Sequence, residues 1–458
     1  MSVFTRKKEI SITEGKLLGN MIRYAIPIMF TNVLQLFYNS ADMYVLGNFC
    51  SDGNAFGSVG CTTALINMIL GLFIGLGAGV CVTLSHSIGA GDDEKSSKIV
   101  HTSFVMAIIF GIVVGVVGFF AAKPLLLIMR TPDEFVSGAT LYVKIYFCGS
   151  VANLMYNFSA GILRSRGDTV RPLLFSSIGG VVNIILNVIF VRYFDMGVEG
   201  VAIATVISQV ISATITVIHM TKLNDACRLC FSKLCLDRKV FVQFIKIGLP
   251  AGIQGSLFSI SNMLLQSGYN SLGTVAVNAN TAASNVDGYI YNILNSFYHV
   301  TLTFASQNFG AGKYDRLKKV MFLSSACVVA IGVFLGVCSY MFSDLFLGIF
   351  NSDKEVLNMG RYRLMVVGLP YFLCGLMEIG TAMLRSIGYS FYSLVITFAG
   401  SCFLRIVWVY TVFAAYRNLT ALYMAYPVSW FVTTVILFAV YAICYKHKIK
   451  SKNEKVLV

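Results

Sequence analysis

The sequence has 458 residues, of which 57% are hydrophobic and only 12% are charged. Soluble globular proteins carry about 25% charged residues, so this composition excludes a soluble enzyme, a nucleic-acid-binding protein and a disordered chain. The net charge of +14 comes from Lys and Arg in short connections between apolar blocks. Because such connections orient membrane proteins, we interpret this charge as a sign of membrane topology and not of a nucleic-acid partner.

Apolar blocks separated by turn signals predict twelve membrane-spanning helices. Blocks of about 20 residues fit the ~30 Å hydrocarbon core of a bilayer. We therefore expect an all-α integral membrane protein, with two six-helix bundles at 1–220 and 242–445, a linker at 221–241 and a basic tail at 446–458. The expected spans lie at 20–47, 57–88, 99–122, 138–163, 172–193, 198–220, 242–270, 277–307, 319–342, 358–384, 389–414 and 419–445.

The basic residues predict the orientation of these spans. Most of the 35 Lys and Arg residues fall on the side that holds both termini, including Arg6, Arg164, Lys313 and the tail after Lys446. Basic connections stay in the cytoplasm. We therefore expect both termini to be cytoplasmic, in the plasma membrane (the inner membrane of a bacterium), with an even number of spans.

The two halves of the chain repeat each other. Ser85-His-Ser-Ile-Gly-Ala-Gly91 recurs as Ser306-Gln-Asn-Phe-Gly-Ala-Gly312, and Leu163-Arg-Ser-Arg-Gly167 recurs at the same displacement as Leu384-Arg-Ser-Ile-Gly388. Each half also opens with a proline, Pro27 or Pro250. Six spans separate equivalent positions, so the repeat is parallel, and substrate sites in such transporters lie between the halves near the bilayer midplane.

Together these features resemble the multidrug and toxic compound extrusion (MATE) family of the flippase-like transporter superfamily. The resemblance rests on Ala25-Ile-Pro27, on Asn39-Ser-Ala-Asp42, on the two Gly-Ala-Gly turns and on the two Leu-Arg-Ser-x-Gly motifs. It implies a V-shaped pair of six-helix bundles that exports amphipathic or cationic organic molecules in exchange for H⁺ or Na⁺. The implied partners are small molecules and the bilayer, the implied protein is a monomer, and no cofactor besides the coupling ion is expected.

Asp42 is the first of three acids inside the expected spans, where a carboxylate costs on the order of 2.5–3.5 kcal/mol and needs a partner, an ion or water. Gln35, Tyr38 and Asn39 share its helical face by their spacing, and Asn183 and Asn187 share a face of another span. The family resemblance implies an ion or proton site at Asp42, Asn183, Asn187 and Thr205, with Tyr142 beside it. Family members often have Asp at the position of Asn187, which leaves the choice of H⁺ or Na⁺ open. The alternative is a hydrogen-bond network that only joins helices.

The other two acids, Asp287 and Glu378, lie in the second half. They could attract a cationic substrate, or one could pair with a buried cation such as Arg405. The sequence favours neither of these two interpretations over the other. The candidate residues of the substrate cavity are Gln35, Tyr38, Asn39, Asn157, Gln254, Gln266, Asp287, Tyr291, Asn295 and Glu378.

Other kinds of function fit the sequence less well. A flippase for a lipid-linked saccharide would need a cationic interior, and the apparent interior charges are three acids against Lys144 and Arg405. A membrane enzyme would need paired His or Asp clusters, which the sequence does not display. Cys227, Cys230 and Cys235 lack the second cysteine pair of a convincing zinc motif, so we expect no structural metal, although Na⁺ at Asp42 is possible.

Overall fold

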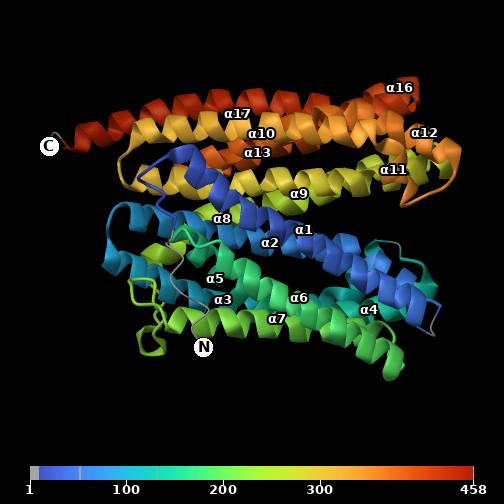
Figure 1. Cartoon of the computed structure of the whole chain (residues 1–458), viewed down its shortest axis with the longest axis horizontal. Coiled ribbons are helices and arrows are strands. Elements are labelled where there is room, and N and C mark those ends of the chain that lie inside the picture. Colours follow the sequence, from blue (N-terminus) through green and yellow to red (C-terminus); the bar gives the residue numbers. More distant parts are fainter. Residues whose placement is uncertain (1–9, 51–52, 130, 457–458) are drawn as a thin grey trace. The chain divides into compact units, whose positions relative to one another are not determined.

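The computed structural model describes residues 10–50, 53–129 and 131–456, and within these ranges every regular element is a helix (Figure 1). The chain divides into two compact units. The first contains Ile26–Gly252 and the segment that ends at Ser11, and the second contains Ile12–Ala25 and Ile253–Val458. We describe each unit separately below.

The first unit is built mainly from helices α1 to α8. Apolar residues run through most of the length of these helices, as expected for membrane-spanning helices whose outer faces contact lipid instead of water. The helices are α1 (Leu17–Phe49), α2 (Ala55–Gly89), α3 (Asp93–Ile128), α4 (Asp133–Cys148), α5 (Ser150–Ser165), α6 (Val170–Val188) with a π-helical extension at Ile189–Tyr193, α7 (Val198–Thr221) and α8 (Arg238–Asn270), with a 3-10 turn at Phe231–Lys233.

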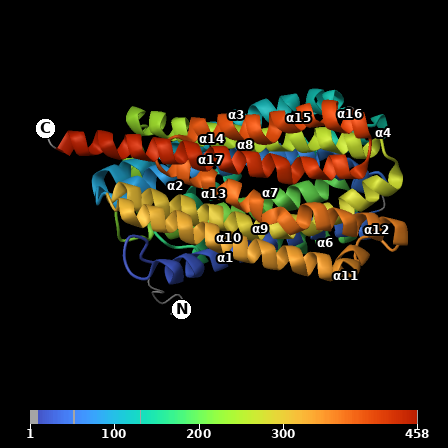
Figure 2. The same ribbon diagram turned by 90° about the horizontal axis from the view of Figure 1, so that it is seen from above.

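The second unit follows the same order but is more often interrupted. Its α13 packs against α9, α10 and α17, and Figures 1 and 2 show α10, α13 and α17 side by side. The helices are α9 (Thr274–Gly310), α10 (Tyr314–Met341), α11 (Ser343–Gly348), α12 (Lys354–Arg363), α13 (Phe372–Ser386), α14 (Ser390–Thr397), α15 (Leu404–Trp408), α16 (Ala414–Tyr416) and α17 (Leu419–Val456), with π or 3-10 turns at Leu364–Gly368, Leu369–Tyr371, Phe398–Phe403 and Val409–Phe413.

The all-helical membrane fold class is confirmed. Ten helical segments of the described chain are long and apolar enough to cross a bilayer, and the pair α4 and α5, bent by 50°, makes eleven. The remaining expected span, 277–307, corresponds to α9, whose polar residues include Asn280, Asp287 and Asn295. The sequence predicted one continuous span at 138–163. The structure instead bends this span at Gly149, where an added Cβ would lie 2.8 Å from Gln209 Oε1 of α7.

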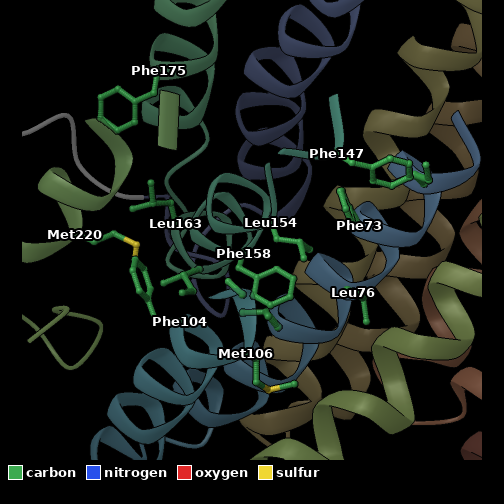
Figure 3. Packing of buried hydrophobic residues seen from close by; sticks show 14 of the residues in the cluster. Phe73, Leu76, Phe104, Met106, Phe147, Leu154, Phe158, Leu163, Phe175 and Met220 are labelled. Carbon is green, nitrogen blue, oxygen red and sulfur yellow. The ribbon is translucent and has the colours of Figure 1, made fainter. Parts of the chain in front are cut away.

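A continuous apolar core fills the first unit. Phe73 of α2, Phe104 of α3 and Phe158 of α5 are almost fully buried, and Met220 of α7 lies near Phe104 (Figure 3). Truncating a side chain in a close-packed core lowers the stability of the fold, because the surrounding helices fill the resulting space only in part. This core supports the helices that carry the polar residues described below.

The compact units differ from the two sequence halves in α1 and α8, each of which changes unit close to its proline. Ala25 is the last α1 residue in the second unit, just before Pro27, and Gly252 is the last α8 residue in the first unit, just after Pro250. Proline lacks the N–H that would continue the helical hydrogen bonds, so each boundary lies where the helix is locally weakened. The start of α1 therefore completes the second unit, and the start of α8 completes the first.

Both exchanged segments are closely packed in the unit that they join. In the second unit, Tyr24 of α1 donates a 2.9 Å hydrogen bond to Thr303 Oγ1, and its ring meets Phe304 edge-on at 5.4 Å. In the first unit, α8 contacts α2 through glycines, and a Cβ added at Gly79 would lie 2.8 Å from Gly248 Cα. Small residues at such positions allow two membrane helices to approach at backbone distance.

The connection at 221–241 is folded onto the first unit. Leu223, Cys227 and Leu229 are buried in the core of that unit. His101 Nε2 accepts a 3.0 Å hydrogen bond from the backbone N–H of Cys230. Within the described chain, no group of three His, Cys, Asp or Glu side chains is placed to hold a metal ion. Neither Cys227 nor Cys230 forms a disulfide in the described chain, and the Cys227 side chain packs in this core.

Candidate functional site

A cavity of about 360 Å³ lies inside the first unit. Its walls come from α1, α2, α4, α5, α6 and α7, and most of the side chains that line it carry an amide, a hydroxyl or a carboxyl group. Among the described residues on its wall, Asp42 is the sole acid and none is basic. Polar groups are expensive in a membrane unless they face protein, water or a ligand, so this polar cavity is the candidate site.

Asp42 is held by a chain of hydrogen bonds that joins three helices. Asn187 Nδ2 of α6 donates to Asp42 Oδ1 of α1 at 2.5 Å and also approaches Asn183 Oδ1 at 3.3 Å. Asn183 Nδ2 in turn donates to Thr205 Oγ1 of α7 at 3.3 Å, and Thr205 donates to the carbonyl of Val201. The structure therefore brings together the four residues that the family resemblance implied.

Tyr142 of α4 is a further wall residue of this cavity and is buried. Its neighbour one turn later, Tyr146, lies nearly parallel to it with ring centroids 6.5 Å apart. Tyr142 thus lies in the same cavity as Asp42, as the resemblance implied.

One oxygen in this network has no partner. Asn187 is fully buried, and among the described residues its Oδ1 accepts no hydrogen bond. Leaving a buried amide oxygen unpaired costs about 1–3 kcal/mol, which a cation or a donor at that place would offset. Carboxylate, amide and hydroxyl oxygens are the ligands that hard cations such as Na⁺ prefer, and a carboxylate can equally take a proton. The oxygens of this network are thus of the chemical type that a small cation or a proton requires.

The expected substrate residues of the first half all line this cavity. Gln35, Tyr38 and Asn39 come from α1, as their helical spacing predicted, and Asn157 comes from α5. The sequence analysis missed Asn153, although it lies four residues before Asn157 on the same helical face. Asn157 Nδ2 donates to Asn153 Oδ1 at 2.7 Å. It also missed Tyr146 and Gln209, which lie one helical turn after the expected residues Tyr142 and Thr205, as well as Asn67 and Tyr156.

In the second unit, Asp287 forms a buried ion pair with Arg363. Arg363 Nη1 contacts Asp287 Oδ2, and the side chains are only 4% and 5% exposed, respectively. One acid thus pairs with a buried cation, as the alternative reading expected, but for Asp287 this cation is Arg363 and not Arg405. Arg405 instead donates to Ser429 Oγ at 2.9 Å and to Asn262 Oδ1 at 3.2 Å, and it lies over the Tyr426 ring. Asp287 is neutralised by a neighbour and does not face a substrate as a free charge.

The interior of the second unit is more basic than the sequence suggested. Arg363, Arg385 and Arg405 are all buried, whereas the sequence analysis counted only Arg405 among them. Arg385 is held by Tyr298 Oη at 2.5 Å and by Gln254 Oε1 at 2.7 Å. Glu378 is 9% exposed and has no basic nitrogen within 4.0 Å in the described part of the chain.

The remaining expected residues of the second half make contacts within the second unit. Gln266 Oε1 accepts a 3.0 Å hydrogen bond from Asn280 Nδ2. Asn295 Nδ2 donates weakly to Tyr291 Oη at 3.4 Å. Gln254, as described above, holds Arg385. None of these three pairs lines the cavity of the first unit.

Comparison with known proteins identifies the family. A sequence model of the MatE family matches residues 27–189 and 250–411, once in each half. Among curated proteins, the chain is 26% identical over 440 residues to "Probable multidrug resistance protein YoeA" of Bacillus subtilis (strain 168), which covers 94% of each chain. It is 22% identical over 370 residues to "Multidrug export protein MepA" of Staphylococcus saprophyticus, which covers 80% of this chain and 81% of that protein.

Solved structures show the same fold. "Outward-facing conformation of a multidrug resistance MATE family transporter of the MOP superfamily" matches with a TM-score of 0.89 at 20% identity and covers 97% of this chain and all of that one. A transporter from Pyrococcus furiosus, described under "Reverse polarity of binding pocket suggests different function of a MOP superfamily transporter", matches with a TM-score of 0.90 at 20% identity, over 97% and 99% of the two chains. These relatives are transporters and not enzymes. Because the family model matches more than half of the sequence, this multi-pass membrane protein belongs to the MatE family.

Proposed function

We propose that the protein is an antiporter that exports small organic molecules in exchange for H⁺ or Na⁺ bound at Asp42. The observation that carries this proposal is Asp42 itself, which lies on the wall of a polar cavity inside membrane-spanning helices. A carboxylate at such a place is costly and by default functional. The names of two relatives, a multidrug resistance protein and a multidrug export protein, support export of drug-like molecules.

Coupling would follow from the two states of the Asp42 carboxylate. In one state H⁺ or Na⁺ neutralises it, with the unpaired Asn187 Oδ1 as a further oxygen ligand. In the other state the carboxylate carries no ion, and among the described residues the amide of Asn187 is its hydrogen-bond donor. A bound ion can drive transport only if it binds one conformation of the protein more tightly than the other. This is supported by the contact between Asp42 of α1 and Asn187 of α6, which a relative movement of the two helices would change.

The test uses proteoliposomes that contain ethidium, a lipophilic cation, or chloramphenicol, which is uncharged. Transport is driven by a pH gradient without Na⁺, or by a Na⁺ gradient at equal pH. We expect Asp42→Asn to abolish gradient-driven transport of whichever compound is exported, because an amide can neither release a proton nor hold Na⁺ as a carboxylate does. Asn187→Asp should strengthen any Na⁺ dependence, since it adds a second anionic ligand.

The matched control is Asp344→Asn, an exposed acid at the start of α11 that should leave transport unchanged. Transport by Asp42→Asn at the parental rate would remove Asp42 from the mechanism. The absence of ion-driven transport of both compounds by the parental protein would contradict the proposed function itself.

We also propose that the protein is a monomer in the plasma membrane with both termini and the 221–241 connection in the cytoplasm. Cys235 in this connection is exposed and can serve as the probe. In a variant that retains Cys235 as its single cysteine, an impermeant maleimide should label inside-out vesicles but not intact cells. Labelling of intact cells would contradict the proposed orientation. The molar mass of the purified protein, measured by light scattering, would test the proposal that it is a monomer.

A second candidate function is a flippase for a lipid-linked saccharide. The observation that favours it is the presence of buried Arg385 and Arg405, neither of which has a carboxylate within 4.0 Å among the described residues. We rank it second because both guanidinium groups are held by neighbouring protein oxygens, while the polar cavity of the first unit has no basic wall residue. Binding of a polyprenyl pyrophosphate that is lost in Arg405→Gln would favour the flippase.

A further inference from the structure

The start of α8 carries three basic side chains that form no ion pair in the described chain. Arg238, Lys239 and Lys246 are exposed, and none of them has a carboxylate within 4.0 Å among the described residues. The first turn of α8 contains no acidic residue. Asp237, just before the helix, accepts the backbone N–H groups of Lys239 and Val240 on its Oδ1, at 2.8 and 3.0 Å. Its carboxylate therefore serves as the cap of the helix.

The three basic side chains surround an open pocket. The pocket has a volume of about 450 Å³ and is lined by Arg238, Lys239, Val242, Gln243 and Lys246. Positions 238, 242 and 246 follow each other at one helical turn, so the pocket runs along one face of α8. Positive charge is unfavourable at the N-terminal end of a helix, because the helix dipole is itself positive there. An anion in the pocket would offset both the side-chain charges and the dipole.

The same face of α8 continues as an apolar surface. Val242 and Leu249, four residues before and three residues after Lys246, are 41% and 40% exposed. Val240 and Phe244 on the opposite face are buried in the core of the first unit. Because α8 is long and apolar enough to cross a bilayer, an exposed apolar face on it is suited to contact lipid. A lysine within such a face extends its ammonium group towards the lipid phosphates.

Membrane topology alone does not account for Lys246. Positive charges orient a membrane protein from the connections between its spans. Lys246 instead lies two turns inside α8. The 221–241 connection already supplies basic residues for orientation, namely Lys222, Arg228 and Lys233. Another role is therefore needed for a charge at this depth of the helix.

The internal repeat places a cation at the same depth in both halves. Arg23 precedes Pro27 of α1 by four residues, just as Lys246 precedes Pro250 of α8, and both basic side chains are exposed. In a parallel repeat, equivalent positions lie at the same level of the membrane. An exposed cation at both positions is expected if the two opening helices pass the phosphate layer of one leaflet.

We propose that the α8 basic pocket (Arg238, Lys239, Val242, Gln243 and Lys246) binds the phosphate of an anionic phospholipid such as phosphatidylglycerol. The three basic side chains would contact the phosphate oxygens, and the exposed apolar residues of the same face would contact the acyl chains. Charge alone would attract a soluble phosphate equally, but only a lipid also covers these apolar residues. The proposal is independent of the coupling ion and of the transported compound.

The experiment measures which lipid surrounds a reporter beside the pocket. In the full-length chain with its other cysteines replaced, Leu249→Cys is labelled with bimane and reconstituted into liposomes of phosphatidylcholine and phosphatidylglycerol. Bromine atoms on the acyl chains of one lipid or the other quench the label on contact, so the two quenching curves give the relative binding of the two lipids. We expect phosphatidylglycerol to bind more than about tenfold more tightly, because each basic residue near the surface contributes about fivefold.

Substitutions test the individual cations. Lys239→Gln and Lys246→Gln should each reduce the preference for phosphatidylglycerol by about fivefold, whereas Lys246→Arg should keep it. Quenching by brominated phosphatidylcholine should stay the same in all three variants, which would show that the label still faces lipid and that the helix is intact.

The matched control is a reporter on α6, where the basic residue is already neutralised. Arg171 and Leu174 have the same three-residue spacing as the pocket lysine and the first reporter, and Leu174 is 39% exposed. Arg171, however, forms a 2.8 Å ion pair with Asp168. A label at Leu174→Cys should therefore be quenched equally by the two lipids. Lys222→Gln, which removes an exposed charge from the connection, should leave the preference at the first reporter unchanged.

Equal binding of the two lipids beside the pocket, or an unchanged preference in both glutamine variants of the pocket, would overturn the proposal. An equally strong preference at Leu174 would also overturn it, because it would show a general attraction to the protein. Loss of the preference when inorganic phosphate replaces chloride at equal ionic strength would identify a site for soluble phosphate instead. These measurements use no ion gradient and no transported compound, so their failure is distinct from a failure of the antiport proposal.

Discussion

Breaking the buried ion pair between Asp287 and Arg363 should destabilise the second unit strongly. In Arg363→Met, the apolar side chain fills much of the arginine's volume but leaves the Asp287 carboxylate buried without a counter-charge. Breaking such a pair from one side costs about 3–5 kcal/mol. A pair on the protein surface would cost only about 0–1 kcal/mol, and the exposures of 4% and 5% place this pair among the buried ones.

A double replacement tests whether the cost comes from the unpaired charge. Replacing both members of a buried pair by apolar residues is often neutral or even stabilising. Asp287→Leu combined with Arg363→Met should therefore recover most of the stability that Arg363→Met loses. The matched control is Arg361→Met on the same helix, where the arginine is exposed and lies over the Tyr340 ring. This control should change stability by less than about 1 kcal/mol.

The assay is equilibrium unfolding in mixed micelles, followed by tryptophan fluorescence. Both tryptophans of the chain, Trp408 and Trp430, belong to the second unit, so their signal reports on the unit that contains the pair. A cost below about 1 kcal/mol for Arg363→Met, or a double variant as unstable as the sum of the single ones, would refute the reasoning.

Three further predictions concern the first unit. Gly79→Leu should lower thermal stability by about 1–3 kcal/mol, because its Cβ would press on the backbone of Gly248, and the melting temperature in detergent would show this. Gly180→Ala should move the Tyr38 ring, which occupies the space of the new Cβ, and so weaken ligand binding in nanodiscs more than it lowers stability; equal affinity would contradict this. Leu229→Asp should release the 221–241 connection from the core, because an unpaired buried charge costs several kcal/mol, and faster tryptic cleavage there would be the readout.

Much of the site in the first unit followed from the sequence because its residues lie at helical spacing. Gln35, Asn39 and Asp42 recur at steps of three or four, and Asn183 and Asn187 do the same. Residues at such steps share a helical face, and polar residues on a face inside a membrane turn towards a polar cavity. The structure places all five on the wall or in the hydrogen-bond network of one cavity.

The second unit shows what spacing along a helix cannot reveal. Asp287 and Arg363 are far apart in the chain and meet only through the packing of α9 against α12. A helical pattern says which residues share a face but not which helix that face meets. The same limit applies to Arg385, whose motif marked the end of a span, although its side chain reaches back to Gln254 and Tyr298. The bend between α4 and α5 at Gly149 was likewise missed, because it lies where the chain packs closely against Gln209 of α7.

The exchange of helix segments at Pro27 and Pro250 has a consequence for the origin of the chain. Suppose that each half descends from one half-length ancestor. The first part of the opening helix in each copy would then have packed in the compact unit of the other copy, as the starts of α1 and α8 do in the present chain. A single copy would then have lacked one helical segment, and two copies would have supplied it to each other by domain swapping. Fusion of the two genes would have turned this intermolecular exchange into an intramolecular one. Separately expressed 1–230 and 231–458 fragments should accordingly be unstable alone and recover together.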